Sequence, residues 1–123
     1  MKFHIVFTAL FLGSAFIEDA HCQNNGNHFK GNFNHGIGNL NNVMGNFNMF
    51  KGNSNHFLGN YNLAYGNYNA IQGNSNNLFG NGNMLAGNSN NVLGNQNNAN
   101  GSMNNIFGNG NAAMGFKNSI AGD

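Results

Sequence analysis

Several residue types are scarce in this chain of 123 residues, and each shortage excludes a class of protein. Pro and Trp are absent, and only four Lys and three acidic residues carry a formal charge. No basic surface is available to neutralise phosphates, so we expect no binding to nucleic acid. The single Cys excludes a disulfide framework within one chain. Because acid and base catalysis needs positioned titratable groups, we also expect no enzymatic activity and no cofactor.

The first 22 residues have the features of a secretory signal peptide. Lys2 provides a positive start, and the largely apolar segment 5–17 is too short to span a bilayer. Ala20 and Cys22 are small residues at the −3 and −1 positions of a cut before Gln23. Cleavage after Ala20 is the alternative, and it would leave Cys22 free to cross-link two chains. No second hydrophobic segment follows, so we expect a secreted extracellular product without a membrane span.

The remainder of the chain is a heptad repeat rich in Asn and Gly. Gly recurs at every seventh residue from Gly31 to Gly122, and the spacing never slips. Counted from this Gly as position 1, position 2 is mostly Asn and position 6 is mostly apolar. Position 4 is always Asn: Asn34, Asn41, Asn48, Asn55, Asn62, Asn69, Asn76, Asn83, Asn90, Asn97, Asn104, Asn111 and Asn118. The predicted organisation is a signal peptide (1–22), a degenerate N-terminal cap (23–30) and a repeat region (31–123).

Two familiar repeat structures do not fit this pattern. A coiled coil needs two apolar positions per heptad and good helix formers, whereas Gly and Asn weaken a helix in every unit. Collagen needs Gly at every third residue together with Pro. A disordered low-complexity chain is the main alternative, since Gly- and Asn-rich segments often fail to pack. The constant phase of the repeat argues against disorder and favours stacked units of one geometry.

The repeat therefore predicts an all-β fold, a parallel β-solenoid or β-roll. Gly and Asn accept left-handed backbone, so each Gly-Asn pair should form a corner, with a five-residue strand between corners. Alternation along the strand should send positions 2, 4 and 6 inward and positions 3, 5 and 7 outward. The position-4 Asn side chains, stacked from coil to coil, can then form a ladder of amide hydrogen bonds that satisfies them in the interior.

The outward residues indicate two heptads per coil. Position 7 carries larger side chains in one set of alternate heptads, which includes Ile37, Tyr65 and Phe79, than in the other, which includes Gln72 and Ala86. Two strands per coil would give about seven coils in a rod about 33 Å long. A three-sided coil of three heptads is the alternative.

The heptad Gly pattern from Gly31 onward resembles the repeats in the head domains of bacterial trimeric adhesins, which are left-handed β-rolls with two heptads per coil. Its Gly-Asn-x-Asn phrase resembles the Asn/Gln-ladder repeats of curli-type functional amyloids. The adhesin repeats carry Ala and Ser at positions that hold Asn in this chain, and the curli repeat has a longer period. The resemblance concerns architecture, and no functional residue is transferred from it.

Candidate functional residues lie on the predicted outer surface. His35 and His56 both occupy position 5, three heptads apart, so in a two-sided coil they should fall on opposite faces, and we expect no metal site. Asn100 heads the chain's Asn-x-Ser/Thr sequon and is a candidate for N-glycosylation at a predicted corner. A set of outward aromatic residues exceeds what a soluble monomer usually displays and predicts an assembly face: Phe33, Phe47, Tyr61, Tyr65, Tyr68, Phe79 and Phe107.

These features favour a secreted, non-enzymatic structural protein whose partner is itself, assembling into a fibre, coat or adhesive material. An ice-binding solenoid is the alternative, because a regular solenoid can present a flat array of small polar groups to a surface such as ice or a matrix. Against it, no Thr follows the signal peptide. A Gly-rich defence peptide is a weaker alternative, since a formal charge of +2 after cleavage attracts anionic membranes poorly.

Overall fold

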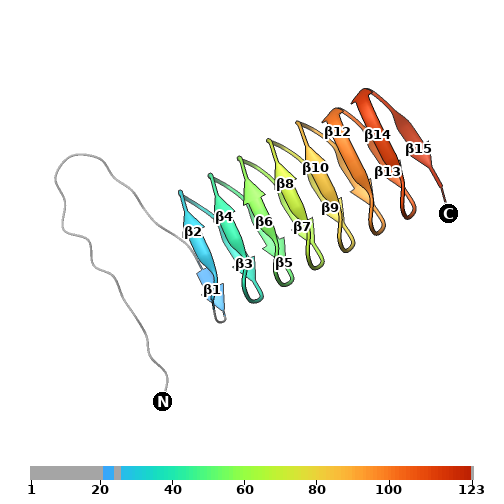
Figure 1. The fold of residues 1–123 in the computed structure, drawn as a ribbon. Helices are drawn as coiled ribbons and strands as arrows, with labels where there is room; N and C mark the ends of the chain where they lie inside the picture. The colour runs from blue at the N-terminus through green and yellow to red at the C-terminus, as the bar shows by residue number, and fades with distance from the viewer. Residues whose placement is uncertain (1–20, 24–25, 123) are drawn as a thin grey trace, which may run out of the picture.

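The computed structural model describes residues 21–23 and 26–122, so most of the predicted signal peptide lies outside it. This part of the chain consists of strands joined by turns and contains no helix (Figure 1). The strands are β1 (His21–Gln23), β2 (His28–Lys30), β3 (His35–Ile37), β4 (Asn42–Met44), β5 (Met49–Lys51), β6 (His56–Leu58), β7 (Leu63–Tyr65), β8 (Ala70–Gln72), β9 (Asn77–Phe79), β10 (Met84–Ala86), β11 (Asn91–Leu93), β12 (Asn98–Ser102), β13 (Asn105–Phe107), β14 (Ala112–Phe116) and β15 (Ser119–Ala121).

The strands alternate between two parallel sheets. Odd-numbered strands form an eight-stranded sheet from β1 to β15, and even-numbered strands form a seven-stranded sheet from β2 to β14. Each strand pairs with residues fourteen positions away, as His35 pairs with Met49. Figure 1 shows the resulting row of two-stranded coils stacked into a rod. The predicted β-solenoid with two heptads per coil is therefore confirmed, and the disordered and three-sided alternatives are wrong.

The turns differ from the prediction in length and in conformation. Most strands cover only positions 5 to 7, because positions 1 to 4 form the turn. The left-handed residue is position 3, not the Asn at position 2, and eleven non-Gly residues there have φ between 56° and 58°. Phe47 and Tyr61 are among them. Each costs roughly 1 kcal/mol in backbone strain, so the surrounding hydrogen bonds must hold the turn in place.

Gly at position 1 is required by the close approach of successive coils. The φ of Gly80 is 139°, a conformation that L side chains rarely adopt. A Cβ atom built on Gly80 would overlap the carbonyl oxygen of Gly94 in the next coil. The same overlap with the next coil's Gly occurs at position 1 of nearly every turn. This contact explains why the Gly spacing of the sequence never slips.

The interior contains a column of apolar position-6 side chains contributed alternately by the two sheets. From Val43 to Ala113, these side chains are at most 2% exposed. Gly36 is the exception in sequence, and the ring of Phe50 in the next coil fills the space that a side chain at Gly36 would occupy. Phe50 also stacks on Phe29 at 5.5 Å and meets Phe57 edge-on at 5.4 Å.

Beside this buried position-6 core, position-4 Asn residues form the predicted inner ladder, and Asn34 to Asn104 are only 1% exposed. The backbone N–H and Nδ2 of Asn76 donate to Asn62 Oδ1 at 3.0 and 3.1 Å. Asn76 Nδ2 also donates to Gly87 O of the next coil at 2.8 Å. The buried amides are thereby satisfied, as the sequence predicted. Asn111 and Asn118, in the last coil, are only half-buried.

Position 2 does not point inward, contrary to the prediction, because it lies within the turn, where the strand alternation does not hold. Its Asn residues are half-buried or exposed and form a second, outer ladder. Asn60 N–H and Nδ2 donate to Asn74 Oδ1 at 2.9 and 3.2 Å. Donation in the outer ladder therefore runs towards the C-terminal end, whereas donation to Oδ1 in the inner ladder runs towards the N-terminal end.

The two ladders predict different costs for the same substitution. Asn76→Ala leaves Asn90 N–H and Nδ2 without their buried acceptor and should lower the free energy of unfolding by about 3 kcal/mol. Asn74→Ala is the matched control, and water can replace its exposed bonds, so it should cost less than about 1 kcal/mol. Denaturant unfolding followed by CD measures both values, and equal costs would contradict burial of the inner ladder.

Two neighbouring glycines predict a second contrast. Gly80→Ala forces a side chain into the next coil and should destabilise the rod by at least about 3 kcal/mol. Gly82→Ala, at position 3, meets only Gln96 Cγ at 3.8 Å and should cost about 1 kcal/mol of left-handed strain. Thermal unfolding of the two variants provides the measurement, and a tolerated Gly80→Ala would disprove the close approach.

Candidate assembly surfaces

The outward aromatic residues do not form one face, contrary to the prediction, because position 3 lies in the turns and position 7 on the sheets. One row of turns, which leads from the seven-stranded to the eight-stranded sheet, carries Phe33, Phe47 and Tyr61. Their rings stack at 4.8 Å between Phe33 and Phe47 and at 5.0 Å between Phe47 and Tyr61. Tyr68 is 72% exposed on the opposite row of turns.

The remaining predicted aromatics lie on the eight-stranded sheet. Tyr65, Phe79, Leu93 and Phe107 occupy position 7 in four successive strands, and all are exposed. We call these four residues the apolar column. The rings of Tyr65 and Phe79 are 5.2 Å apart and within 3° of parallel. The column gives this sheet a continuous apolar strip across four coils.

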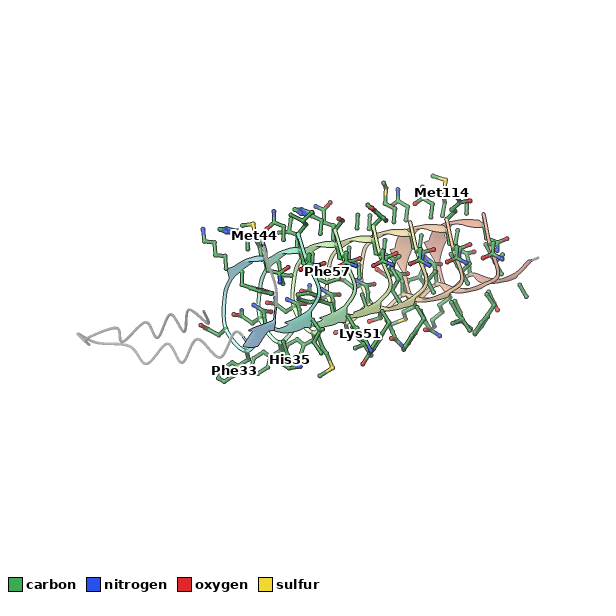
Figure 2. The ribbon with its side chains drawn as sticks, turned by 90° about the horizontal axis from the view of Figure 1, so that it is seen from below. Phe33, His35, Met44, Lys51, Phe57 and Met114 are labelled. Carbon is green, nitrogen blue, oxygen red and sulfur yellow. The ribbon has the colours of Figure 1, made fainter. Side chains whose placement is uncertain are left out.

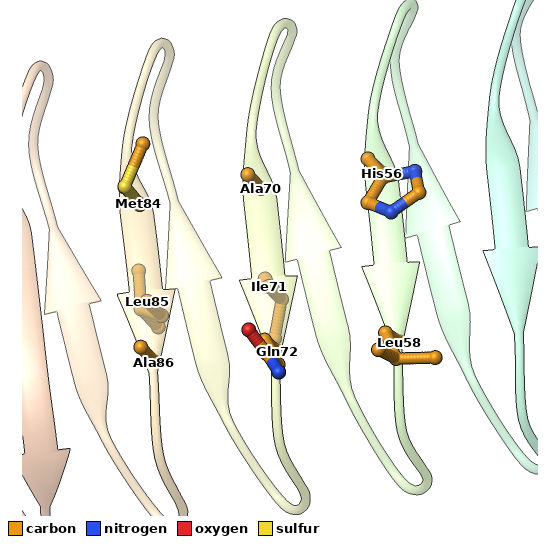
Figure 3. Close-up of a pocket in the computed structure, with 8 residues that line it drawn as sticks. All are labelled: His56, Leu58, Ala70, Ile71, Gln72, Met84, Leu85 and Ala86. Carbon is orange, nitrogen blue, oxygen red and sulfur yellow. The ribbon is translucent and has the colours of Figure 1, made fainter.

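An open hollow of about 430 Å³ lies beside Met44 and Leu58 on the seven-stranded sheet, and a smaller one of about 190 Å³ is shown in Figure 3. The smaller hollow lies over Ala70 and Ala86, whose small side chains leave space between His56, Leu58 and Met84. Binding pockets for small molecules usually enclose about 300 Å³ or more, so this hollow is too small and open to hold one.

Charged and titratable side chains are dispersed over the rod. Figure 2 shows His35 and Lys51 on the opposite side of the rod from Met44 and Met114, with Phe57 inside. His35 belongs to the eight-stranded sheet and His56 to the seven-stranded sheet, which confirms that they face apart. Within residues 21–23 and 26–122, no three His, Cys, Asp or Glu side chains lie close enough to hold a metal ion.

The candidate glycosylation site, Asn100, lies within β12 and not at a corner. It occupies position 7, in the middle of β12, and its side chain is exposed on the seven-stranded sheet. Occupancy of the sequon stays a prediction.

The two ends of the described rod are a further pair of candidate assembly surfaces. Phe29 in β2 and Ile120 in β15 pack against the core but are only half-buried, unlike the position-6 residues between them. The repeat itself indicates this partial exposure, because the first and last side chains of a stacked column have a neighbour on one side only. Each end therefore exposes both an apolar core residue and unpaired backbone groups.

Comparison with known proteins adds no functional information. No family model matches the chain, and neither a curated protein nor a solved structure shows significant similarity to it. The resemblance to adhesin and curli repeats thus rests on the repeat pattern alone. Among the strands and turns that the structure describes, no helix has the length and apolar character to cross a membrane.

Two deletions test whether the difference between the faces matters. Removing residues 73–86 deletes one coil and leaves every later residue on its own sheet, so the rod only shortens. Removing residues 73–79 moves the later strands to the other sheet, so Phe107 comes to lie in the column of Gln72. We expect both chains to keep a β-rich CD spectrum, and only the shorter deletion to lose ordered side-by-side packing in electron micrographs. Equal packing would show that the faces are interchangeable.

Proposed function

We propose that this protein is a secreted, non-enzymatic structural protein that self-assembles into an extracellular fibre, coat or adhesive material. The observation that carries the proposal is the apolar column on one side of a rod whose described sheets end in edge strands at both ends. Apolar strips of this kind on soluble proteins usually mark sites of association. A second copy of the rod has the same coil spacing and can match the column residue for residue.

The charge distribution supports the same proposal. Residues 23–122 contain three Lys and no Asp or Glu, so little repulsion opposes contact between copies. Natural sheets often protect their edge strands with charge, Pro or bulges. Pro is absent from this chain, and Lys30 is the charged residue of β2, the first strand of the seven-stranded sheet. Unprotected edges favour addition of further strands.

Ice binding is the second candidate, and one observation favours it. Asn77, Asn91 and Asn105 occupy position 5 of successive strands and form a regular polar column beside the apolar one. Thermal hysteresis in a nanolitre osmometer decides this alternative, and no hysteresis is expected if the protein is a structural material.

The proposed assembly depends on the apolar column, so a charge within it should weaken association. Phe79→Lys should raise the concentration needed for assembly by roughly tenfold, which corresponds to about 1.4 kcal/mol. Gln72→Lys, at position 7 of the other sheet, is the matched control and should assemble like the unmodified chain. Thioflavin fluorescence and a meridional reflection near 4.8 Å in fibre diffraction report the assembly. A secreted chain that stays monomeric at high concentration for weeks would refute the proposed function.

A further inference from the structure

We propose that copies of this protein join head to tail, with the last coil of one rod docked on the first coil of the next. In this arrangement β2 of the incoming copy pairs with β14, and its β3 pairs with β15. The inference rests on the proposed function and names the surface and the polarity by which assembly proceeds. The partner is a second copy of the same chain.

The first argument is the direction of the inner ladder. Along the rod, each position-4 Asn accepts at Oδ1 the bonds of the Asn one coil later, as Asn104 accepts from Asn118 N–H at 3.0 Å. The last coil therefore ends on acceptors, because Asn111 Oδ1 and Asn118 Oδ1 receive no hydrogen bond within residues 26–122. The first coil ends on a donor, because Asn34 N–H has no acceptor in the described part of the chain.

The outer ladder supplies the opposite set of groups at each end. Asn95 N–H and Nδ2 donate to Asn109 Oδ1 at 2.9 Å, while Asn109 itself donates to no described residue. At the other end, Asn32 Oδ1 accepts nothing from the described residues. Asn109 and Asn32 lie on opposite rows of turns and do not meet in the docked register, where Asn32 follows Phe116, the last position-2 residue of its own row. Joining two like ends would place inner acceptors against inner acceptors.

The amide of Asn118 also indicates which acceptor a docked coil would supply. Inside the rod, Nδ2 of a position-4 Asn donates to the Gly carbonyl of the next coil, as Asn104 does to Gly115 O at 3.0 Å. No coil follows Asn118 within the described residues, and its Nδ2 turns back to Met114 O at 2.8 Å. A docked copy places Gly31 O at the position that an interior Asn would use.

The apolar core points to the same junction. Phe29 and Ile120 are half-buried at opposite ends, and docking stacks the coil containing Phe29 on the coil containing Ile120, which removes both side chains from water. Position 3 adds a specific contact. Lys117 Nζ lies 5.2 Å from the ring centroid of Phe116, and the docked register brings Phe33 into the same row of turns, next to Lys117. A cation–π contact can therefore extend across the junction.

Strand β1 occupies the edge that the junction needs. It pairs with β3, from His21 with His35 to Gln23 with Ile37, where β15 of the preceding copy would pair. The predicted signal cut before Gln23 removes His21 and Cys22, two of the three residues of β1. Removal of the signal peptide therefore leaves only Gln23 of β1 on the docking edge, where it must give up its place beside Ile37 to Ala121 of the preceding copy, and assembly begins only with the processed chain.

A head-to-tail contact uses two different surfaces and does not close on itself, so it generates a filament. The shift from one copy to the next is seven coils, which gives an axial repeat of about 34 Å at ~4.8 Å per coil. Every coil along the filament then has a neighbour on both sides, including the coils at each junction.

Two end-blocked variants test the polarity. Phe29→Lys blocks the first coil, and Ile120→Lys blocks the last coil, with Gln72→Lys on a side surface as the control. All chains are expressed with their signal peptide and collected as secreted protein. Analytical ultracentrifugation below the concentration at which the apolar columns associate should show each end-blocked variant as a monomer, because every junction needs one end of each kind. An equal mixture should form a heterodimer and stop, while Gln72→Lys assembles like the unmodified chain.

The other outcomes separate the junction from the proposed function. Dimers of one blocked variant alone would show that like ends join, and undiminished assembly of both would show that the rods associate only by their sides. Either result overturns the head-to-tail junction and leaves the proposed function intact. Failure of the unmodified chain to assemble would instead refute the proposed function. If a lysine variant loses its β-rich CD spectrum, Phe29→Asn and Ile120→Asn replace the pair.

The role of β1 has its own test. A chain processed two residues earlier, with Cys22→Ser to prevent cross-linking, retains His21 and therefore all of β1. Its assembly should need at least a tenfold higher concentration than the chain that begins at Gln23, with both N-termini verified by mass spectrometry. Equal assembly of the two chains would overturn the blocking role of β1.

Discussion

The structure depends on the hydrogen bonding of the buried position-4 Asn amides. A buried amide without hydrogen-bond partners costs several kcal/mol. Every turn from Asn34 to Asn104 places one Asn amide in the interior. Each amide is satisfied only if the next coil lies directly above it in the same register. This requirement fixes the coil at fourteen residues, aligns the Gly carbonyls that accept from Nδ2, and leaves no freedom for one coil to slip.

The ladder also explains how the turns tolerate unfavourable backbone. Position 3 holds Phe, Tyr, Leu or Ser with φ near 57°, although a non-Gly residue is disfavoured there. From Phe47 to Met103, the N–H of the position-3 residue donates to the carbonyl of the Asn one coil earlier, as Tyr61 does to Asn46 O at 3.0 Å. Because both neighbouring positions are held by Asn ladders, the turn is fixed from two sides and the side chain at position 3 is free to vary.

The sequence predicted those features that repeat without exception, and it failed where the repeat varies. Constant Gly at position 1 and Asn at position 4 specified the two-heptad solenoid and its inner ladder. The conformation of position 3 could not be predicted, because Phe47 and Ser54 share no property that indicates left-handed backbone. Consequently the predicted strands are longer than the observed ones, and position 2 was wrongly predicted to face the interior. Phe33 was also grouped with Phe79, although Phe33 lies on a turn and Phe79 on a sheet.

Parallel stacking makes the rod polar, and this polarity links the fold to assembly. All strands of a sheet point the same way, and the inner and outer ladders donate in opposite directions. The hydrogen-bonding groups left at the two described ends of the rod therefore differ, and they have no partners within the same rod. Globular repeat proteins commonly satisfy such ends with polar capping repeats. In this chain β15 keeps the apolar Ile120 at position 6 and the preceding turn keeps Asn118 at position 4, so the last described coil retains the core and inner-ladder residues of an interior one. A coil of that kind is completed best by another coil, and the first coil of a second copy is the nearest chemical equivalent of the one that is missing.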